Sequence, residues 1–155
     1  MKIAIGSDNL GLELKEFVKK VLTDNSIEFI DAGVFNKDPM DYPDIAEKVA
    51  DMVVSGECER GILVCGTGIG MAIAANKVEG IRAAVCHDPY SAERSIKSND
   101  VQIMALGALV VGQAVAKSMV ETWIKAEFTG GPSAIKINKI MQLEKRSKMK
   151  EENTL

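Results

Sequence analysis

Five short apolar segments alternate along the chain with segments of helical hydrophobic spacing, and this alternation constrains the fold more than any other feature. The apolar segments are rich in β-branched residues, which favours strands, and they cover residues 2–6, 27–33, 61–65, 81–86 and 101–107. The segments between and after them repeat apolar residues at helical spacing, and they cover residues 11–25, 45–56, 68–77, 89–97 and 113–128. The alternation predicts a five-stranded parallel sheet with helices on both faces, a three-layer α/β/α sandwich.

A further helical pattern follows the last predicted strand and helix. It runs from Ser133 to Lys145, after TGGP at residues 129–132, and it predicts a helix beyond a sheet that is already complete. We expect this helix to pack on a partner chain and form a homodimer, with a tetramer as the alternative. We assign residues 1–145 to a single domain and the polar residues 146–155 to a C-terminal tail.

Composition and charge exclude several classes of protein. The formal net charge is −3, which does not indicate a nucleic-acid partner, and no apolar run approaches the roughly 20 residues of a membrane span. The first residues, MKIAIGSD, lack the regions of a secretory signal peptide, so we expect a cytoplasmic protein with reduced cysteines. With one histidine and no CxxC pair among three cysteines, no metal site is predicted.

A cysteine stands where the third predicted strand passes into a glycine-rich loop, in GILVCGTGIGMAIAANK at residues 61–77. One interpretation of Cys65 is a small buried hydrophobic residue, as most free cysteines are. Its surroundings favour a chemical role, because glycines let a ligand approach the backbone and the start of the next helix stabilises negative charge. A base in that position suits removal of a proton from a carbon next to a carbonyl. A nucleophile is less favoured, since no histidine is near in the sequence to activate it.

An acid follows the first predicted strand, Asp8 in GSDN. Ligands of open parallel sheets lie at the carboxyl ends of the strands, near the point where the strand order reverses. In a strand order of 2-1-3-4-5 the first and third strands are neighbours at that point, so Asp8 and Cys65 would face one crevice. The alternative is that Asp8 caps a helix or closes a turn.

The glycine loop also has to be weighed as a cofactor site. Its sequence, GTGIG at residues 66–70, is neither GxGxxG nor GxxxxGK[ST]. Asp88 lies near the end of the next predicted strand, where an acid could bind a ribose, but a dinucleotide site ordinarily uses the first strand. We therefore expect no cofactor, while phosphate alone at this helix start stays open.

Several motifs together carry a resemblance to a known family. They are GSDNLGLELK at residues 6–15, the block from SGECERG to DPYSA at residues 55–92, and TWIKAEFTGG at residues 122–131. Nearly the whole chain resembles type B ribose-5-phosphate isomerases, a family that includes the subunits of galactose-6-phosphate isomerase. The resemblance implies a Rossmann-like fold, a dimer with active sites shared across its interface, and no metal. It also implies aldose–ketose isomerisation of a sugar phosphate through a cis-enediolate.

The resemblance further implies roles for individual residues. Cys65 would be the base that moves a proton between C1 and C2, and the Thr67 hydroxyl would assist proton transfer on the oxygens. Asp8 and Asn99 would bind sugar hydroxyls, and Tyr42 would line the pocket. The enediolate oxygens would be bound by the backbone amides of Gly66, Thr67, Gly68, Ile69 and Gly70.

The chain departs from the family pattern where the family binds phosphate and opens the sugar ring. Asn9 and Ser98 stand where the family has histidines, and Leu109 and Pro132 stand where it has arginines. Lys136 keeps a cation at such a position, but one lysine does not reproduce bidentate recognition of phosphate by arginine. A phosphate that is placed differently would be bound by Asn9, Ser133, Lys136 and Lys139.

Three hypotheses about function follow from these departures. In the first, the chain isomerises a pentose phosphate, or a tetrose or hexose phosphate; a tetrulose phosphate cannot form the usual ring and needs no ring-opening acid. In the second, the substrate carries no phosphate. In the third, the chain is a partner-dependent or non-catalytic sugar-binding subunit of a heteromeric isomerase, which the intact Cys65 loop disfavours.

Overall fold

The computed structural model describes the backbone of residues 1–152 and the side chains of residues 1–146. This part of the chain forms five strands and six helices. The strands are β1 (Lys2–Ser7), β2 (Glu28–Gly33), β3 (Arg60–Cys65), β4 (Ala83–Val85) and β5 (Ile103–Gly107). The helices are α1 (Leu12–Asp24), α2 (Tyr42–Val54), α3 (Ile69–Ala75), α4 (Pro89–Asn99), α5 (Gln113–Lys125) and α6 (Pro132–Glu152).

All five strands form one parallel sheet, in the order β2-β1-β3-β5-β4. The predicted neighbours β1 and β3 are adjacent, but the predicted order of the last two strands is wrong. β5 lies between β3 and β4, so that Cys65 pairs with Gly107. Every residue of β5 is buried, as a strand with neighbours on both sides requires, whereas the three half-buried residues of β4 form an edge.

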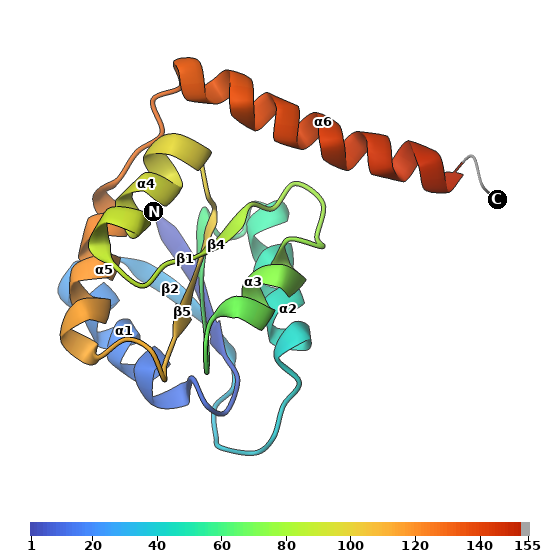
Figure 1. The fold of residues 1–155 in the computed structure, drawn as a ribbon. Coiled ribbons are helices and arrows are strands. Elements are labelled where there is room, and N and C mark those ends of the chain that lie inside the picture. Colours follow the sequence, from blue (N-terminus) through green and yellow to red (C-terminus); the bar gives the residue numbers. More distant parts are fainter. Residues whose placement is uncertain (153–155) are drawn as a thin grey trace.

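Helices cover both faces of the sheet, which confirms the three-layer α/β/α sandwich (Figure 1). α1, α4 and α5 pack on one face around the fully buried Trp123, and α2 and α3 pack on the other face around Met71. Successive side chains of a strand point to opposite faces. Ile3 and Ile5 therefore belong to the first core and Ala4 to the second.

The start of α2 differs from the sequence-based expectation. The helix begins at Tyr42 rather than at Ile45, and Pro43 lies in its first turn. Proline is well tolerated there because the first helical amides have no acceptor within the helix. The loop before it is correspondingly shorter, and it delivers the Tyr42 side chain to the end of the sheet where β1 and β3 finish.

α6 lies beyond the amino ends of the strands and extends past the rest of the molecule (Figure 1). The Glu144 carboxylate accepts hydrogen bonds from the Gly80 amide at 3.1 and 3.2 Å. The Met141 sulfur lies 3.3 Å from Arg82 Nη1, and Ile137 is buried. These contacts fix α6 to the loop after α3 and to the start of β4.

Apolar side chains are also exposed on α6. Ile135 is 63% exposed and Ile140 is 44% exposed. The helix runs to Glu152, past its predicted end. The boundary at residue 145 stays a prediction, because most of the predicted tail, residues 146–155, lies outside the described side chains. None of the helices in the described part of the chain is long and apolar enough to cross a bilayer.

Candidate active site

A pocket of about 430 Å³ opens at the carboxyl ends of β1 and β3, between which the strand order reverses. This is the edge at which open parallel sheets bind ligands. The pocket is lined by Asp8, Leu10, Tyr42, Cys65, Gly66, Thr67, Ile69, Gly70 and Leu109. All of these except the two leucines are predicted site residues, so one crevice does unite the end of the first strand with the thiol and its glycine loop.

Cys65 is the last residue of β3 and is buried at the wall of this pocket. Its carbonyl accepts a hydrogen bond from the Ala108 amide at 2.8 Å, which ties it to the end of β5. Its sulfur accepts a hydrogen bond from the Gly68 amide at 3.1 Å. This contact fixes the sulfur at the start of the glycine loop.

The other two cysteines behave as buried hydrophobic residues. Burial raises the pKa of the Cys86 thiol to about 11 and also raises the pKa of Cys58. Neither residue lines the pocket. Cys58 and Cys86 therefore fit the interpretation of a free cysteine as a small buried hydrophobic residue, whereas Cys65 lines the pocket.

The glycines at positions 68 and 70 allow close packing that a residue with a side chain would prevent. Gly68 has a φ of +79°, and a methyl group there would lie 3.0 Å from the carbonyl carbon of Leu106. A methyl group on Gly70 would lie 2.7 Å from the Tyr42 ring. The Gly68 amide is occupied by the Cys65 sulfur, and Gly68 itself does not line the pocket. Binding of the enediolate by the amides of this loop stays a prediction.

Asp8 lies in the pocket wall and also closes a turn. It follows β1, is buried and lines the pocket. Its Oδ1 also accepts a hydrogen bond from the Gly11 amide at 2.8 Å, which closes the turn before α1. Asn9 is half-buried beside it but is not part of the pocket wall.

Three predicted site residues lie at the other end of the sheet. α4 runs from the end of β4 back to the start of β5, so Asn99 at its last position lies at the amino ends of the strands. Its carbonyl oxygen is 3.2 Å from Arg82 Nε. α5 returns in the same direction, so Ser133 and Lys136 in the first turns of α6 lie at that end too. A single chain therefore does not bring these residues to the thiol.

The two leucines of the pocket wall are not among the predicted site residues. Leu10 is 56% exposed and Leu109 is 75% exposed, and a methyl group on Gly66 would lie 3.3 and 3.5 Å from their Cδ1 atoms. The sequence singled out Leu109 only as a residue that replaces an arginine of the family; the pairing of β5 with β3 brings it beside Cys65. The described residues of the wall include no lysine, arginine or histidine.

A family model described as Ribose/Galactose Isomerase matches residues 3–140. The chain belongs to this family. Ribose-5-P isomerase B of Listeria innocua is 51% identical over 148 residues, which cover 96% of this chain and 100% of that protein. D-erythrulose-4-phosphate isomerase of Pectobacterium atrosepticum is 46% identical over 152 residues, which cover 96% of this chain and 98% of that protein. The resemblance found in the sequence is thereby confirmed.

A solved ribose-5-phosphate isomerase B has the same fold. The structure of Clostridium thermocellum ribose-5-phosphate isomerase B matches with a TM-score of 0.93 and 51% identity, over 95% of this chain and 99% of that one. The α/β sandwich of this chain is therefore shared with that structure.

Proposed function

We propose that this chain is an aldose–ketose isomerase of a small sugar phosphate in which Cys65 is the base. The observation that carries the proposal is the place of the Cys65 sulfur, in the pocket wall at the strand ends with the Gly68 amide 3.1 Å away. Membership of the ribose/galactose isomerases supports the same class of reaction.

The reaction moves a proton between two neighbouring carbons. The Cys65 thiolate removes the proton from the carbon next to the carbonyl, which leaves a cis-enediolate, and returns it to the other carbon. The Thr67 hydroxyl assists the transfer of a proton between the two oxygens. Backbone amides of the loop stabilise the enediolate charge, while Asp8 and Tyr42 bind and enclose the sugar.

The preferred substrate in this proposal is a four-carbon sugar phosphate. In a tetrose 4-phosphate O4 is esterified and cannot close the five-membered ring that ribose 5-phosphate closes through O4. Such a substrate needs no ring-opening acid, which fits Ser98 in place of a histidine. The Pectobacterium relative is named for a four-carbon substrate and the Listeria relative for a five-carbon one, so an experiment has to decide between them.

We further propose a cytoplasmic homodimer in which each chain completes the pocket of the other, with pairing into a tetramer as the alternative. Asn99, Ser133 and Lys136 lie at the opposite end of the sheet from the pocket of their own chain. The exposed Ile135 and Ile140 supply an apolar face for contact between chains. Lys136 would bring a cation to a pocket whose described wall has none.

Proton exchange in D₂O tests the chemistry. The wild type and Cys65→Ala are incubated with tetrose, pentose and hexose phosphates and with the free sugars, and deuterium at C1 and C2 is followed by NMR. We expect exchange with the wild type only, fastest for a four-carbon phosphate. Cys86→Ala, which removes a thiol that does not line the pocket, is the matched control and keeps the activity.

Two outcomes would contradict this proposal in different ways. A fully active Cys65→Ala variant would refute the role of the thiol. An inert wild type would favour the alternative of a partner-dependent or non-catalytic sugar-binding subunit, and adding a second, related chain would then be the test of that alternative.

A further inference from the structure

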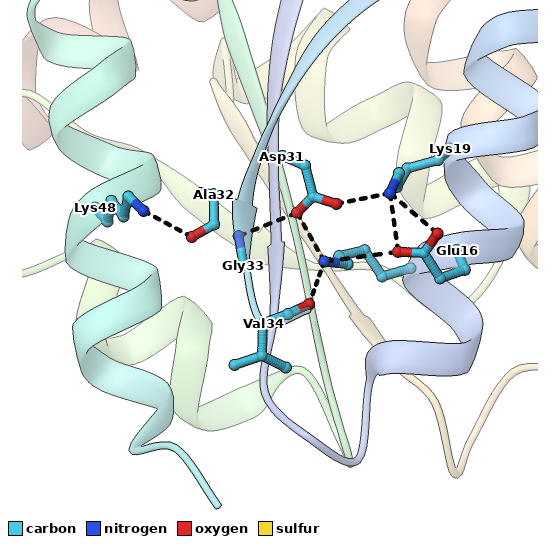
Figure 2. Close-up of polar contacts among 8 residues, drawn as sticks. Glu16, Lys19, Asp31, Ala32, Gly33, Val34 and Lys48 are labelled. Carbon is cyan, nitrogen blue, oxygen red and sulfur yellow. Dashed lines mark hydrogen bonds and ion pairs between the residues drawn. The ribbon is translucent and has the colours of Figure 1, made fainter. Parts of the chain in front are cut away.

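Lys15 of α1 is fully buried, although lysines on an amphipathic helix ordinarily face water. Its Nζ lies 2.7 Å from Asp31 Oδ1 and 2.5 Å from the Val34 carbonyl oxygen, two acceptors that Figure 2 labels. It also lies 5.2 Å from the centre of the Phe35 ring. Since a buried ammonium group is costly unless it is paired and hydrogen-bonded, this side chain holds a defined place, at the point where β2 ends and the next loop begins.

Val34, the first residue of that loop, is held from two sides. Its amide donates to the Ser7 carbonyl at 2.9 Å, at the end of β1, and its carbonyl accepts from Lys15. The loop ends at Tyr42, the first residue of α2. The Tyr42 ring lies so close to the glycine loop that a methyl group on Gly70 would be 2.7 Å from it. Anchoring Val34 therefore fixes one end of the segment that delivers Tyr42 to the pocket.

Lys15 is also joined to Asp8 through the first turn of α1. Asp8 Oδ1 accepts from the Gly11 amide at 2.8 Å, and the Gly11 carbonyl accepts from the Lys15 amide at 2.9 Å. Ser7, which precedes Asp8, accepts from Val34. These contacts close a ring that runs through Asp8, Gly11, Lys15, Val34 and Ser7.

We propose that Lys15 is a positioning residue of the active site, which sets the places of Asp8 and Tyr42 through the Val34 carbonyl and the first turn of α1. Lys15 is not part of the pocket wall, so it acts on the substrate only through these two residues. Its effect on the substrate rests on the proposed function, whereas its effect on the loop does not.

The position requires a charged donor, because the Lys15 ammonium serves a carboxylate and a carbonyl together. Burial alone would raise the pKa of Asp31, but hydrogen bonds from Lys15, Lys19 and the Gly33 amide outweigh it and lower that pKa. The carboxylate stays charged and holds Lys15 in place. Lys19 binds the other oxygen of Asp31, also at 2.7 Å (Figure 2).

The kinetic test compares Lys15→Met with Lys19→Met, on the substrate identified by proton exchange. Lys19 is the matched control, because it binds the same carboxylate from a side chain that is 23% exposed and its hydrogen bonds go to Asp31 and Glu16. We expect Lys15→Met to raise KM about fivefold or more and Lys19→Met to leave it within about twofold. A residue that only stabilised the fold would lower the folded fraction, and so kcat, without changing KM.

A second readout needs no substrate. Hydrogen exchange of the Val34 amide, which donates to the Ser7 carbonyl, should be about tenfold faster in Lys15→Met and unchanged in Lys19→Met. Were the wild type inactive on every sugar, the proposed function would fail and this exchange would still decide the role of Lys15 in the loop. Faster exchange with an unchanged KM, or equal effects of both substitutions, would overturn the proposal.

Lys15→Met leaves the half-buried Asp31 carboxylate with one partner fewer, so that variant alone can fail to fold. The double variant Lys15→Met/Asp31→Asn removes both charges while the Val34 carbonyl still lacks its donor. It should show the same rise in KM and the same faster exchange. Asp31→Asn alone leaves Lys15 an amide oxygen and the Val34 carbonyl as acceptors and should therefore raise KM less than the double variant does; a double variant with the KM of the wild type would refute the proposal.

Discussion

Gly70→Ala tests how closely the Tyr42 ring is held against the glycine loop. A methyl group on Gly70 would lie 2.7 Å from Cε2 and Cζ of the ring and 3.1 Å from its hydroxyl oxygen. Ordinary contact between carbon atoms needs about 3.5–4.0 Å, so the ring has to move by about 1 Å. Tyr42 is 42% exposed, and its ring can therefore move outwards while the backbone stays in place.

The substitution should separate activity from stability. Gly70 lies within α3, where alanine is more favourable than glycine by about 0.5–1 kcal/mol. The free energy of unfolding should therefore change by less than about 1 kcal/mol, or about 4 °C in Tm for a chain of this size. A displacement of about 1 Å in a group that lines the pocket lowers kcat/KM by up to about a hundredfold, and we expect a loss of about tenfold to a hundredfold.

A double-mutant cycle with Tyr42→Ala identifies the cause. In that background no ring remains to meet the methyl group, so Gly70→Ala should lower kcat/KM by less than about threefold. The assay is the initial rate of isomerisation for the wild type and the three variants, with thermal unfolding of each as the control. Equal losses in the two backgrounds would mean that the loop backbone, and not the ring, is disturbed, and would refute the reasoning.

The remaining predictions concern substrate choice, the end of α5 and acid stability. Leu109→Arg should raise kcat/KM for ribose 5-phosphate about tenfold relative to a four-carbon phosphate, because it adds a phosphate-binding cation to the pocket wall; with Leu109→Met as the control, an unchanged ratio would contradict this. Arg60 donates to the carbonyls of Trp123 and Ala126 at 2.8 and 2.7 Å. Since a hydrogen bond to a charged group contributes about 1.5 kcal/mol or more, Arg60→Met should lower the unfolding free energy in urea by about 2–4 kcal/mol, and a loss below about 1 kcal/mol would show that these bonds contribute little. The pKa of Asp31 is lowered in the folded protein, so the unfolded chain binds more protons and stability should fall as the pH drops below about 4. Asp31→Asn should flatten that decline in urea unfolding at different pH values, and parallel curves would count against it.

The elements could be predicted because each carries its own hydrophobic period, but the position of β5 could not be read locally. Its place between β3 and β4 depends on competition among all strands for the interior of the sheet. The composition of Ile103–Gly107 did indicate an interior strand, because the segment is apolar throughout, and the structure buries every residue of it. Pro43 led to a predicted loop where the structure has the start of α2, because a proline that is typical of loops is also favourable in the first turn of a helix.

The predictability of the site residues also depends on whether they are close together in the sequence. Cys65 and its glycines are adjacent in the sequence, so their meeting needed only a strand and the start of a helix. The sequence did not indicate that Lys15 is buried, because a lysine on an amphipathic helix ordinarily belongs to the solvated face. Its partner Asp31 also lies 16 residues away in the sequence. Asn99 and Lys136 were assigned to the site by resemblance alone, and their roles stay predictions that depend on a second chain.

The separation of the pocket from α6 bears on how such a protein changes in evolution. β1 has six residues, and at about 3.3 Å per residue the two ends of the sheet are about 20 Å apart. Substitutions at that distance affect stability additively, so new side chains on α6 do not strain the loop around Cys65. In the proposed dimer, where α6 brings Lys136 to the pocket of the other chain, a lineage could therefore change the phosphate-binding side chains on α6 while the thiol and its loop are inherited unchanged.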